Sequence, residues 1–564
     1  MKRLLKNGTV VNVFTGELIK TNVLFENGII LGVDDYGDDE ADEVIDAAGK
    51  YICPGFIDGH IHIESTMLTC PEFAKTAVSH GTTAVIADPH EIANVSGKDG
   101  LHYMIESSEG LPLTVYFVIP SCVPATGFDE SGAVLSADDI EEFYSESRVL
   151  GLGEVMNYVG VVAGDGELEK KIKSALSRGL VVNGHAPLLS GKPLDKYISA
   201  GIGDDHECSS ADEAKERIRK GQRIMIRQGT AARNLSGLIS LFDDPWEQRC
   251  LLVTDDKHPA DLISNGHIDS IIRSAVQMGK SAVTGIRMAT LHAAECFGLK
   301  NTGAVAPGYK ADLLVLDDLD KVIVRDVYKN GEKVVSDGKT LCFDMPKIND
   351  ALEKKVRSSF NLPMLSSSDF AVDYNGKRKC HVISLVEGQL LTDDLVSDID
   401  FDCNNGIDIE HDILKIAVIE RHHNTGHIGN AFIKGIGLKE GAIASSVAHD
   451  SHNLIVIGTN TDDMAFAANR IRELGGGIVS VKNGKVVAEM PLPIGGLMSC
   501  ETAERAAEEN EKVRESVYSL GVPKGFEPFM IMSFLSLPVI PHLKLTTKGL
   551  VNVDAQRKVP LAAE

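Results

Sequence analysis

Histidine and carboxylate side chains stand at the ends of several short apolar runs in the first half of the chain. His60 and His62 form a His-x-His pair, and on a strand this spacing places both imidazoles on the same side. Four further runs end on single side chains of the same kinds. The complete set is His60, His62, Glu154, His185, His206 and Asp255.

Nitrogen and oxygen ligands in this number suit one or two divalent ions such as Zn, Mn or Fe. Taken singly, each residue has a structural interpretation, because a strand-end histidine is often only hydrogen-bonded and a carboxylate often caps the next helix. The joint occurrence favours a metal site. Glu154 has two free oxygens and is the natural residue to bridge two ions.

Eight apolar β-type runs, several of them separated by helical patterns, carry these side chains. The runs cover residues 56–62, 82–90, 113–121, 149–156, 180–186, 202–207, 223–228 and 250–255. Eight alternating strands over about 250 residues predict an α/β fold of the (β/α)8 TIM-barrel type, with a doubly wound open sheet as the alternative. All six candidate ligands then lie at the carboxyl ends of strands, where barrel enzymes build their sites.

Shorter β-type segments flank this region on both sides. Asn-Gly pairs at Asn7, Asn27 and Asn330 predict hairpin turns. We therefore expect a small β-sandwich domain built from residues 1–50 and 301–345, which flank a barrel at 51–300. Residues 346–564 carry both strand-like and helical runs and predict a C-terminal α/β domain.

Composition restricts the partners of the protein. The 564 residues contain 56 Lys and Arg against 81 Asp and Glu, which gives a formal net charge of −25. Such a field repels phosphate backbones and anionic membranes, so nucleic acid and membrane are not expected partners. No CxxC pair, signal-peptide core or run of about 20 apolar residues is present. We expect a cytoplasmic protein without a transmembrane segment.

Two motifs that bracket the predicted barrel resemble the amidohydrolase superfamily. They are Pro54-Gly55-Phe56-Ile57-Asp58-Gly59-His60-Ile61-His62 and Gly303-Ala304-Val305-Ala306-Pro307-Gly308-Tyr309-Lys310-Ala311-Asp312-Leu313. Within that superfamily the chain resembles the bacterial adenine deaminases over its full length. This resemblance rests on motifs at residues 87–91, 153–157, 183–187, 204–207, 420–426 and 491–496.

The resemblance implies hydrolytic deamination of adenine to hypoxanthine and ammonia, with two divalent ions per chain, Mn2+ foremost and Fe2+ or Zn2+ as alternatives. Glu154 replaces the carboxylated lysine that bridges the ions in many superfamily members. His60 and His62 then hold one ion, and His185 and His206 the other. Asp255 binds an ion and transfers protons as general acid and base.

Several assignments have alternatives. His206 can orient the substrate instead of binding an ion. Asp256 can replace Asp255, although a strand turns only one of two neighbours inward. The activity can also be that of another cyclic amidohydrolase or of a deacetylase, and a non-catalytic scaffold with a hydrolase fold is the alternative outside enzymes. A homo-oligomer, a dimer or larger, is expected from the superfamily.

Further polar residues are candidates for substrate or outer metal-site contacts. Asp88, His90 and Glu91 end the second run, and their alternative is a polar loop over the barrel mouth. The last domain contains a group of histidines, namely His422, His423, His427, His449 and His452. It can be a further metal site, an interface cluster or part of a lid. In the lid interpretation, Glu420 and His422 contact the substrate.

Overall fold

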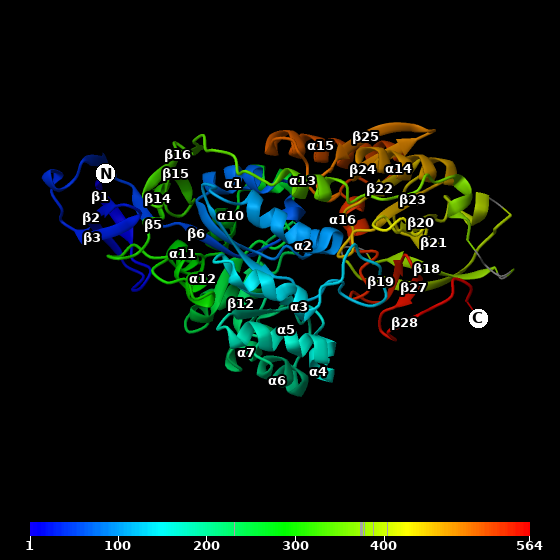
Figure 1. Ribbon diagram of the computed structural model, residues 1–564, viewed down its shortest axis with the longest axis horizontal. Coiled ribbons are helices and arrows are strands. Elements are labelled where there is room, and N and C mark those ends of the chain that lie inside the picture. Colours follow the sequence, from blue (N-terminus) through cyan, green and yellow to red (C-terminus); the bar gives the residue numbers. More distant parts are fainter. Residues whose placement is uncertain (231, 373–375, 377, 387–388, 403, 564) are drawn as a thin grey trace.

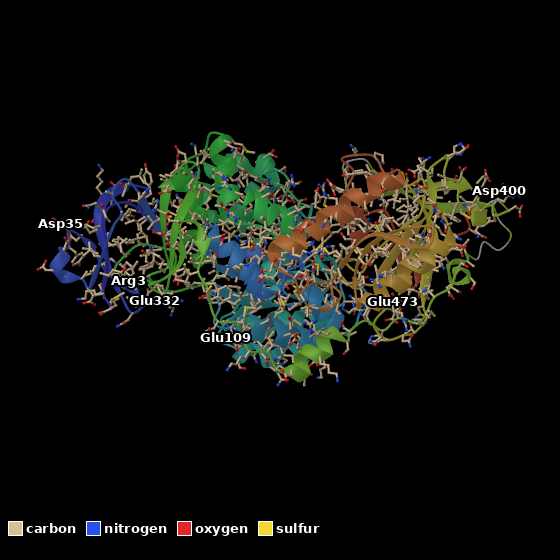
Figure 2. The ribbon with its side chains drawn as sticks, turned by 90° about the horizontal axis from the view of Figure 1, so that it is seen from above. Arg3, Asp35, Glu109, Glu332, Asp400 and Glu473 are labelled. Atoms are coloured by element: carbon tan, nitrogen blue, oxygen red, sulfur yellow. The ribbon has the colours of Figure 1, made fainter. Side chains whose placement is uncertain are left out.

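The computed structural model describes residues 1–230, 232–372, 376, 378–386, 389–402 and 404–563. Its N-terminal strands and its C-terminal sheet lie at opposite ends of the long axis, and a body of parallel strands and helices lies between them (Figure 1). Asp35 and Asp400 mark these two ends (Figure 2). Among the described residues, no helix is long and apolar enough to cross a membrane.

A nine-stranded sheet combines segments from both sides of the parallel-strand body. Its strands are β1 (Arg3–Val11), β2 (Leu18–Glu26), β3 (Ile29–Asp34), β4 (Glu43–Asp46), β5 (Tyr51–Pro54), β14 (Leu313–Asp318), β15 (Ile323–Lys329), β16 (Glu332–Ser336) and β17 (Lys339–Thr340). The sheet splits at β1, because the first half of this strand pairs with β4 and the second half with β5. An ion pair of 2.8 Å between Arg3 and Glu332 joins its distant segments (Figure 2).

The three Asn-Gly pairs take different roles in this sheet. Asn27-Gly28 connects β2 to β3, and Asn330-Gly331 connects β15 to β16, so these hairpin predictions are confirmed. The hairpin predicted at Asn7-Gly8 is wrong. Asn7 lies inside β1 with a φ of 64°, where the register with β2 shifts and forms a bulge. A Cβ at Gly8 would lie 2.5 Å from the Ile52 side chain, so a larger residue there would have to displace Ile52.

Each of the eight predicted apolar runs contains a strand. They are β6 (Phe56–Ile61), β7 (Thr82–Ala87), β8 (Thr114–Ile119), β9 (Val149–Val155), β10 (Val181–Gly184), β11 (Asp204–Asp205), β12 (Arg223–Arg227) and β13 (Cys250–Val253). All neighbouring pairs within β6–β10 and within β11–β13 are parallel. The Gly203 N–H donates to Val182 O at 3.0 Å, and the Asp255 N–H donates to His60 O at 2.9 Å. The last strand therefore lies beside the first.

Helices cover the outside of these strands. The main ones are α1 (Cys70–Ser79), α2 (His90–Ser107), α5 (Gly166–Ser177), α6 (Gly191–Ser199), α7 (Ala211–Arg219), α9 (Pro259–Asn265), α10 (Ile268–Gln277), α11 (Ala282–Met288) and α12 (Leu291–Cys296). Shorter helices are α3 (Ala137–Ile140), α4 (Tyr158–Ala163) and α8 (Leu235–Leu238). The helices pack around the strands, and the candidate side chains lie at the carboxyl ends of these strands, which form one rim.

The C-terminal body contains an eight-stranded sheet of order β19-β18-β21-β20-β23-β22-β24-β25. Its strands are β18 (Lys379–Leu385), β19 (Thr392–Asp398), β20 (Ile413–Ile419), β21 (Ile428–Lys434), β22 (Ala442–Ser445), β23 (Leu454–Gly458), β24 (Gly477–Lys482) and β25 (Lys485–Pro491). A three-stranded sheet follows with β26 (Leu543–Thr546), β27 (Gly549–Asn552) and β28 (Arg557–Lys558). The helices are α13 (Asp350–Arg357), α14 (Thr461–Leu474), α15 (Ala503–Ser516) and α16 (Pro528–Ser533).

The C-terminal body packs directly against the parallel-strand body. Helix α15 contacts α9, and α13 contacts α2. One hydrophobic core runs through both, since it joins Ile61 and Ile92 with Ile478 and Leu492. The rim of the parallel strands therefore lies under residues from the C-terminal half of the chain.

Candidate metal centre

Glu154 occupies the middle of the cluster that the structure forms at this rim. It lies near the end of β9 and is buried. Its Oε1 lies 3.3 Å from His62 Nε2 and 3.9 Å from His60 Nε2. Its Oε2 lies 2.6 Å from His185 Nδ1 and 3.2 Å from His206 Nε2. The two carboxylate oxygens thus face two different pairs of histidines.

The histidines are close enough to share ions. The rings of His60 and His206 stack at 4.4 Å between centroids, and His62 lies edge-on to His60 at 4.7 Å. Four groups of potential ligand atoms within 4.8 Å of one another occur here. They are His60-Glu154-His206, His60-His62-Asp255, His62-His90-Glu154 and His185-His206-Glu207. Buried histidine and carboxylate clusters of this kind can hold divalent metal ions.

Asp255 joins this cluster, whereas its neighbour Asp256 faces elsewhere. Asp255 Oδ1 lies 3.3 Å from His62 Nε2. Its backbone has a φ of 60°, a strained value for a residue other than glycine that turns the chain sharply after β13. The Asp256 carboxylate instead accepts a hydrogen bond of 2.6 Å from Ser65 Oγ. Only one of the two carboxylates therefore points at the histidines.

Asp88, at the end of β7, supports two members of the cluster. His62 Nδ1–H donates to the Asp88 backbone carbonyl at 2.9 Å, which leaves the Nε2 lone pair free to face Glu154 and Asp255. The Asp88 carboxylate accepts the Glu154 N–H at 2.9 Å. Asp88 thus fixes a histidine tautomer and the end of β9, and is fully buried.

Two further aspartates were missed by the sequence analysis. Asp58 accepts hydrogen bonds from Thr254 N–H at 3.1 Å and Thr254 Oγ1–H at 2.5 Å, which ties β6 to the residue before Asp255. Asp204 accepts the Gly184 N–H at 2.9 Å, next to His185. The available signal was the spacing of Asp58, which precedes His60 and His62 by one and two strand periods.

Arg227 and Glu207 were also missed. Arg227 ends β12 and places Nη1 2.6 Å from Asp255 Oδ2 and 2.5 Å from Glu207 Oε1. Glu207 Oε1 in turn lies 3.4 Å from His206 Nε2. The position of Arg227 at the carboxyl end of the seventh run was the signal, because every other residue of the cluster occupies an equivalent place.

The two carboxylates of the cluster, Glu154 and Asp255, favour positive charge beside them. Although burial alone would raise it, the neighbouring His185 holds the pKa of Glu154 well below its ordinary range. Burial likewise opposes ionisation of Asp255, yet the Arg227 guanidinium holds its pKa well below the usual value. Burial lowers the pKa of His185, but Glu207 and Glu154 together raise it to about 9. Both carboxylates stay ionised, and cations at their oxygens are stabilised.

His90 and Glu91 connect the rim to the C-terminal body. His90 Nδ1 lies 3.4 Å from Glu154 Oε1, and its Nε2 lies 3.8 Å from Asp450 Oδ1. Glu91 Oε1 lies 2.8 Å from Ser65 Oγ and 3.1 Å from His449 Nδ1. The segment of residues 447–453, between β22 and β23, therefore reaches the rim.

Glu91, His449 and His452 form another buried group of potential ligand atoms. The Ala448 N–H donates to His452 Nδ1 at 3.1 Å, so this nitrogen is an acceptor and Nε2 carries the proton. A protonated nitrogen cannot bind a metal ion. The geometry favours a hydrogen-bonded interface over a metal site here.

Glu420 and His422 do not join the rim cluster. The Glu420 carboxylate accepts N–H bonds from His422 at 2.5 Å, His423 at 2.7 Å and Thr425 at 3.0 Å, so it closes its own turn. His422 Nε2 lies 2.7 Å from the carbonyl of Ser451. Nearby, His423 lies 3.1 Å from Ser131 O and His427 lies 2.9 Å from Glu130 Oε1, both in the parallel-strand body.

Comparisons with known proteins agree with this arrangement. Residues 51–341 match the Amidohydrolase family, and residues 389–557 match the Adenine deaminase C-terminal domain. Adenine deaminase 2 of Carboxydothermus hydrogenoformans is 44% identical over 99% of this chain and 96% of its own length. Adenine deaminase of Thermosipho africanus is 45% identical over 100% of this chain and 97% of its own.

A third relative, adenine deaminase of Desulfatibacillum aliphaticivorans, is 44% identical over 98% of this chain and 95% of its own length. The parallel strands with their rim cluster therefore adopt the amidohydrolase fold of the TIM-barrel superfamily, with additional β-sheets at both ends. The chain belongs to the adenine deaminase family of amidohydrolases.

Proposed function

We propose that the protein catalyses the hydrolytic deamination of adenine to hypoxanthine and ammonia. The observation that carries this proposal is the position of Glu154, whose two oxygens face two pairs of histidines beside Asp255. The relatives that match nearly the whole chain are named adenine deaminases, which points to adenine as the substrate.

We propose that the cluster holds two divalent ions. The buried His60 Nε2 and His90 Nδ1 have no hydrogen-bond partner within the described part of the chain, so they are free to act as ligands. His60 and His62 would hold one ion, His185 and His206 the other, with Glu154 between them and Asp255 on the first. Mn2+ is the proposed metal, with Fe2+ and Zn2+ as alternatives, because imidazole and carboxylate accept all three.

Bound divalent ions supply Lewis acidity, which lowers the pKa of water and gives a nucleophile near neutral pH. Deamination adds the elements of water at C6 of adenine, protonates the ring nitrogen beside it, and releases the exocyclic amine as ammonia. Asp255 is placed to accept a proton from the attacking water and deliver it to the ring nitrogen, and then to pass the remaining hydroxyl proton to the departing amine. Arg227 holds Asp255 Oδ2, which leaves Oδ1 facing the reaction.

The remaining residues of the rim orient this machinery. Asp88 holds His62 in one tautomer, and Asp58 fixes the segment before Asp255 through Thr254. In this arrangement His206, 3.2 Å from Glu154 Oε2, acts as a ligand rather than by orienting the substrate. These residues belong to strands β6–β13, which we propose to form a (β/α)8 barrel at 51–300. A small β-sandwich domain at 1–50 and 301–345 flanks this barrel in the proposal. Residues 346–564 form the C-terminal α/β domain in this proposal.

The experiment is to incubate Mn-loaded protein with adenine and with adenosine, and to follow ammonia release and the ultraviolet shift to hypoxanthine. We expect turnover of adenine alone. A verified metal-replete sample that leaves adenine unchanged but hydrolyses a cyclic amide would contradict the proposal. The homo-oligomer expected from the sequence stays a prediction, and light scattering of the same sample tests it.

A further inference from the structure

A cavity lies between the rim of the barrel and the C-terminal domain. The barrel contributes Ser65 and Asp256 to its wall, and the C-terminal domain contributes His449 and Phe534. We call it the interdomain cavity. Neither domain forms it alone, since residues from both halves of the chain line it.

The interdomain cavity adjoins the proposed metal site. Asp256 follows Asp255 directly, and Ser65 lies three positions after His62. Ser65 Oγ is within hydrogen-bond distance of both Asp256 Oδ1, at 2.6 Å, and Glu91 Oε1, at 2.8 Å. The cavity therefore borders residues that closely follow two of the proposed metal ligands.

His449 presents a free polar atom in this wall. The residue is only 7% exposed, and its Nδ1 lies 3.1 Å from Glu91 Oε1. Within the part of the chain that the structure describes, the polar contact of the His449 ring is the one that Nδ1 makes with Glu91, and Nε2 makes none. Because His449 lines the cavity, this nitrogen is available to a ligand or to water there.

The shape and chemistry of the wall suit a flat aromatic molecule. The His449 ring stacks on Phe534 with 4.6 Å between ring centroids and an interplanar angle of 20°. Met67, Val447 and Ile478 add apolar surface. Apolar walls with a few fixed polar atoms are the usual composition of a small-molecule site, and heteroaromatic rings offer apolar faces and hydrogen-bonding edges.

We propose that the interdomain cavity receives the edge of the purine opposite C6, and that His449 Nε2 donates a hydrogen bond to a ring nitrogen there, such as N3. This inference rests on the proposed function and assigns part of substrate recognition to the C-terminal domain. Burial lowers the pKa of His449, but the Glu91 carboxylate raises it to about 9, so the imidazole carries both protons near neutral pH. Nε2 is then a donor, and the lone pair of N3 is a matching acceptor.

The test compares adenine with 3-deazaadenine, which has a CH group in place of N3. In the wild-type protein we expect 3-deazaadenine to bind more weakly than adenine, measured as an inhibition constant against adenine turnover. His449→Ala should raise the KM for adenine about tenfold or more, since a hydrogen bond from a charged donor is lost. The same variant should change the inhibition constant of 3-deazaadenine less than threefold.

His427→Gln is the matched control, because His427 also joins the C-terminal domain to a barrel glutamate but is exposed. This variant should keep the wild-type KM. His449→Gln, which keeps a donor on a side chain of similar reach, should recover part of the loss. Metal content should stay unchanged in all three variants.

A wild-type KM in His449→Ala, or an equal loss for adenine and 3-deazaadenine, would overturn the inference. Loss of metal or of the fold in His449→Ala would assign His449 a structural role and would also overturn the inference. The exception is the case in which Phe534→Leu retains its metal and binds both adenine and 3-deazaadenine more weakly. Should the wild-type protein fail to deaminate adenine, the proposed function falls. Calorimetric binding of adenine to wild type and His449→Ala then tests the cavity separately.

Discussion

Buried histidines and carboxylates form one close group in the barrel, whereas three buried cations of the C-terminal domain have no opposite charge beside them within the described residues. Around Glu154, four histidines and Asp255 lie within a few ångströms of one another, and Arg227 adjoins them. In the C-terminal domain, the fully buried Lys415, Arg421 and Lys544 each lack an ion-pair partner among the described residues. Buried charges thus have opposite charges beside them in the barrel but not at these three positions of the C-terminal domain.

The isolated cations are held mainly by backbone carbonyls or by apolar surroundings. Arg421 donates to His452 O at 2.5 Å and to Gly495 O at 3.0 Å, and Lys544 Nζ donates to Leu390 O at 3.1 Å. Burial lowers the pKa of Lys415 to about 8 and that of Arg421 to about 9. Burial therefore favours the neutral form of these cations, whereas in the barrel cluster the neighbouring charges keep Glu154 and Asp255 ionised. Grouping of opposite charges is what makes a buried region able to bind ions.

The largest effect is expected from Glu154→Gln. The amide cannot bridge two cations, so the variant should lose bound metal and at least about 10³-fold in turnover, equivalent to several kcal/mol of transition-state stabilisation. Metal analysis and adenine turnover measure both losses. Chelation should lower the unfolding temperature of the wild-type protein and leave this variant unchanged, because ligand binding stabilises only the folded state that binds it. If Glu154→Gln retained two ions, the grouped charges of the barrel would not be what binds metal, and the contrast with the isolated cations would fail.

Asp255→Asn should lower kcat about 10²-fold or more, since the amide cannot take up and return a proton. Asp256→Asn is its control and should lower kcat less than about tenfold, because Asp256 faces Ser65 and not His62. Steady-state kinetics on metal-replete samples distinguish the two. Equal losses of kcat would show that the turn after β13 does not select one carboxylate.

Lys544→Met should change how stability depends on pH. Burial lowers the pKa of Lys544 to about 7 in the folded chain, whereas an unfolded lysine keeps a pKa of about 10.4. Between these values the unfolded chain binds the extra proton, so the free energy of unfolding rises with pH by up to about 1.4 kcal/mol per unit. The variant should lose this rise and be more stable than wild type near pH 7. Urea midpoints at pH 7, 8.5 and 10 provide the measurement.

The smallest effect is expected at an exposed ion pair. Lys355 of α13 lies 2.9 Å from Asp99 of α2, and both side chains are solvent-exposed. Lys355→Met should change the free energy of unfolding by less than about 1 kcal/mol, with no change in its pH dependence. It therefore serves as the control for Lys544→Met. A pH-dependent shift here would mean that the unfolding signal does not report on buried lysines.

The sequence by itself determined the strands and the type of site. Alternating apolar runs and helical patterns located all eight parallel strands, because a buried strand consists mainly of apolar residues that can be recognised in the sequence. The residues placed at the ends of those runs included all of the histidine and carboxylate groups that surround Glu154 except Glu207. The Asn-Gly pairs predicted two hairpins out of three, since turn chemistry is also local.

Tertiary structure decided the contacts between residues that are far apart in the sequence. Asn7-Gly8 forms a bulge within β1 rather than a turn, and Gly8 lies against Ile52, a residue far from it in the sequence. Arg227 reaches Asp255 only because β12 and β13 are adjacent parallel strands. His449 reaches Glu91 across more than 350 positions, whereas Glu420 turns back on its own loop. Residue type and spacing carry local preferences, and only the folded chain brings these separate groups within hydrogen-bonding distance.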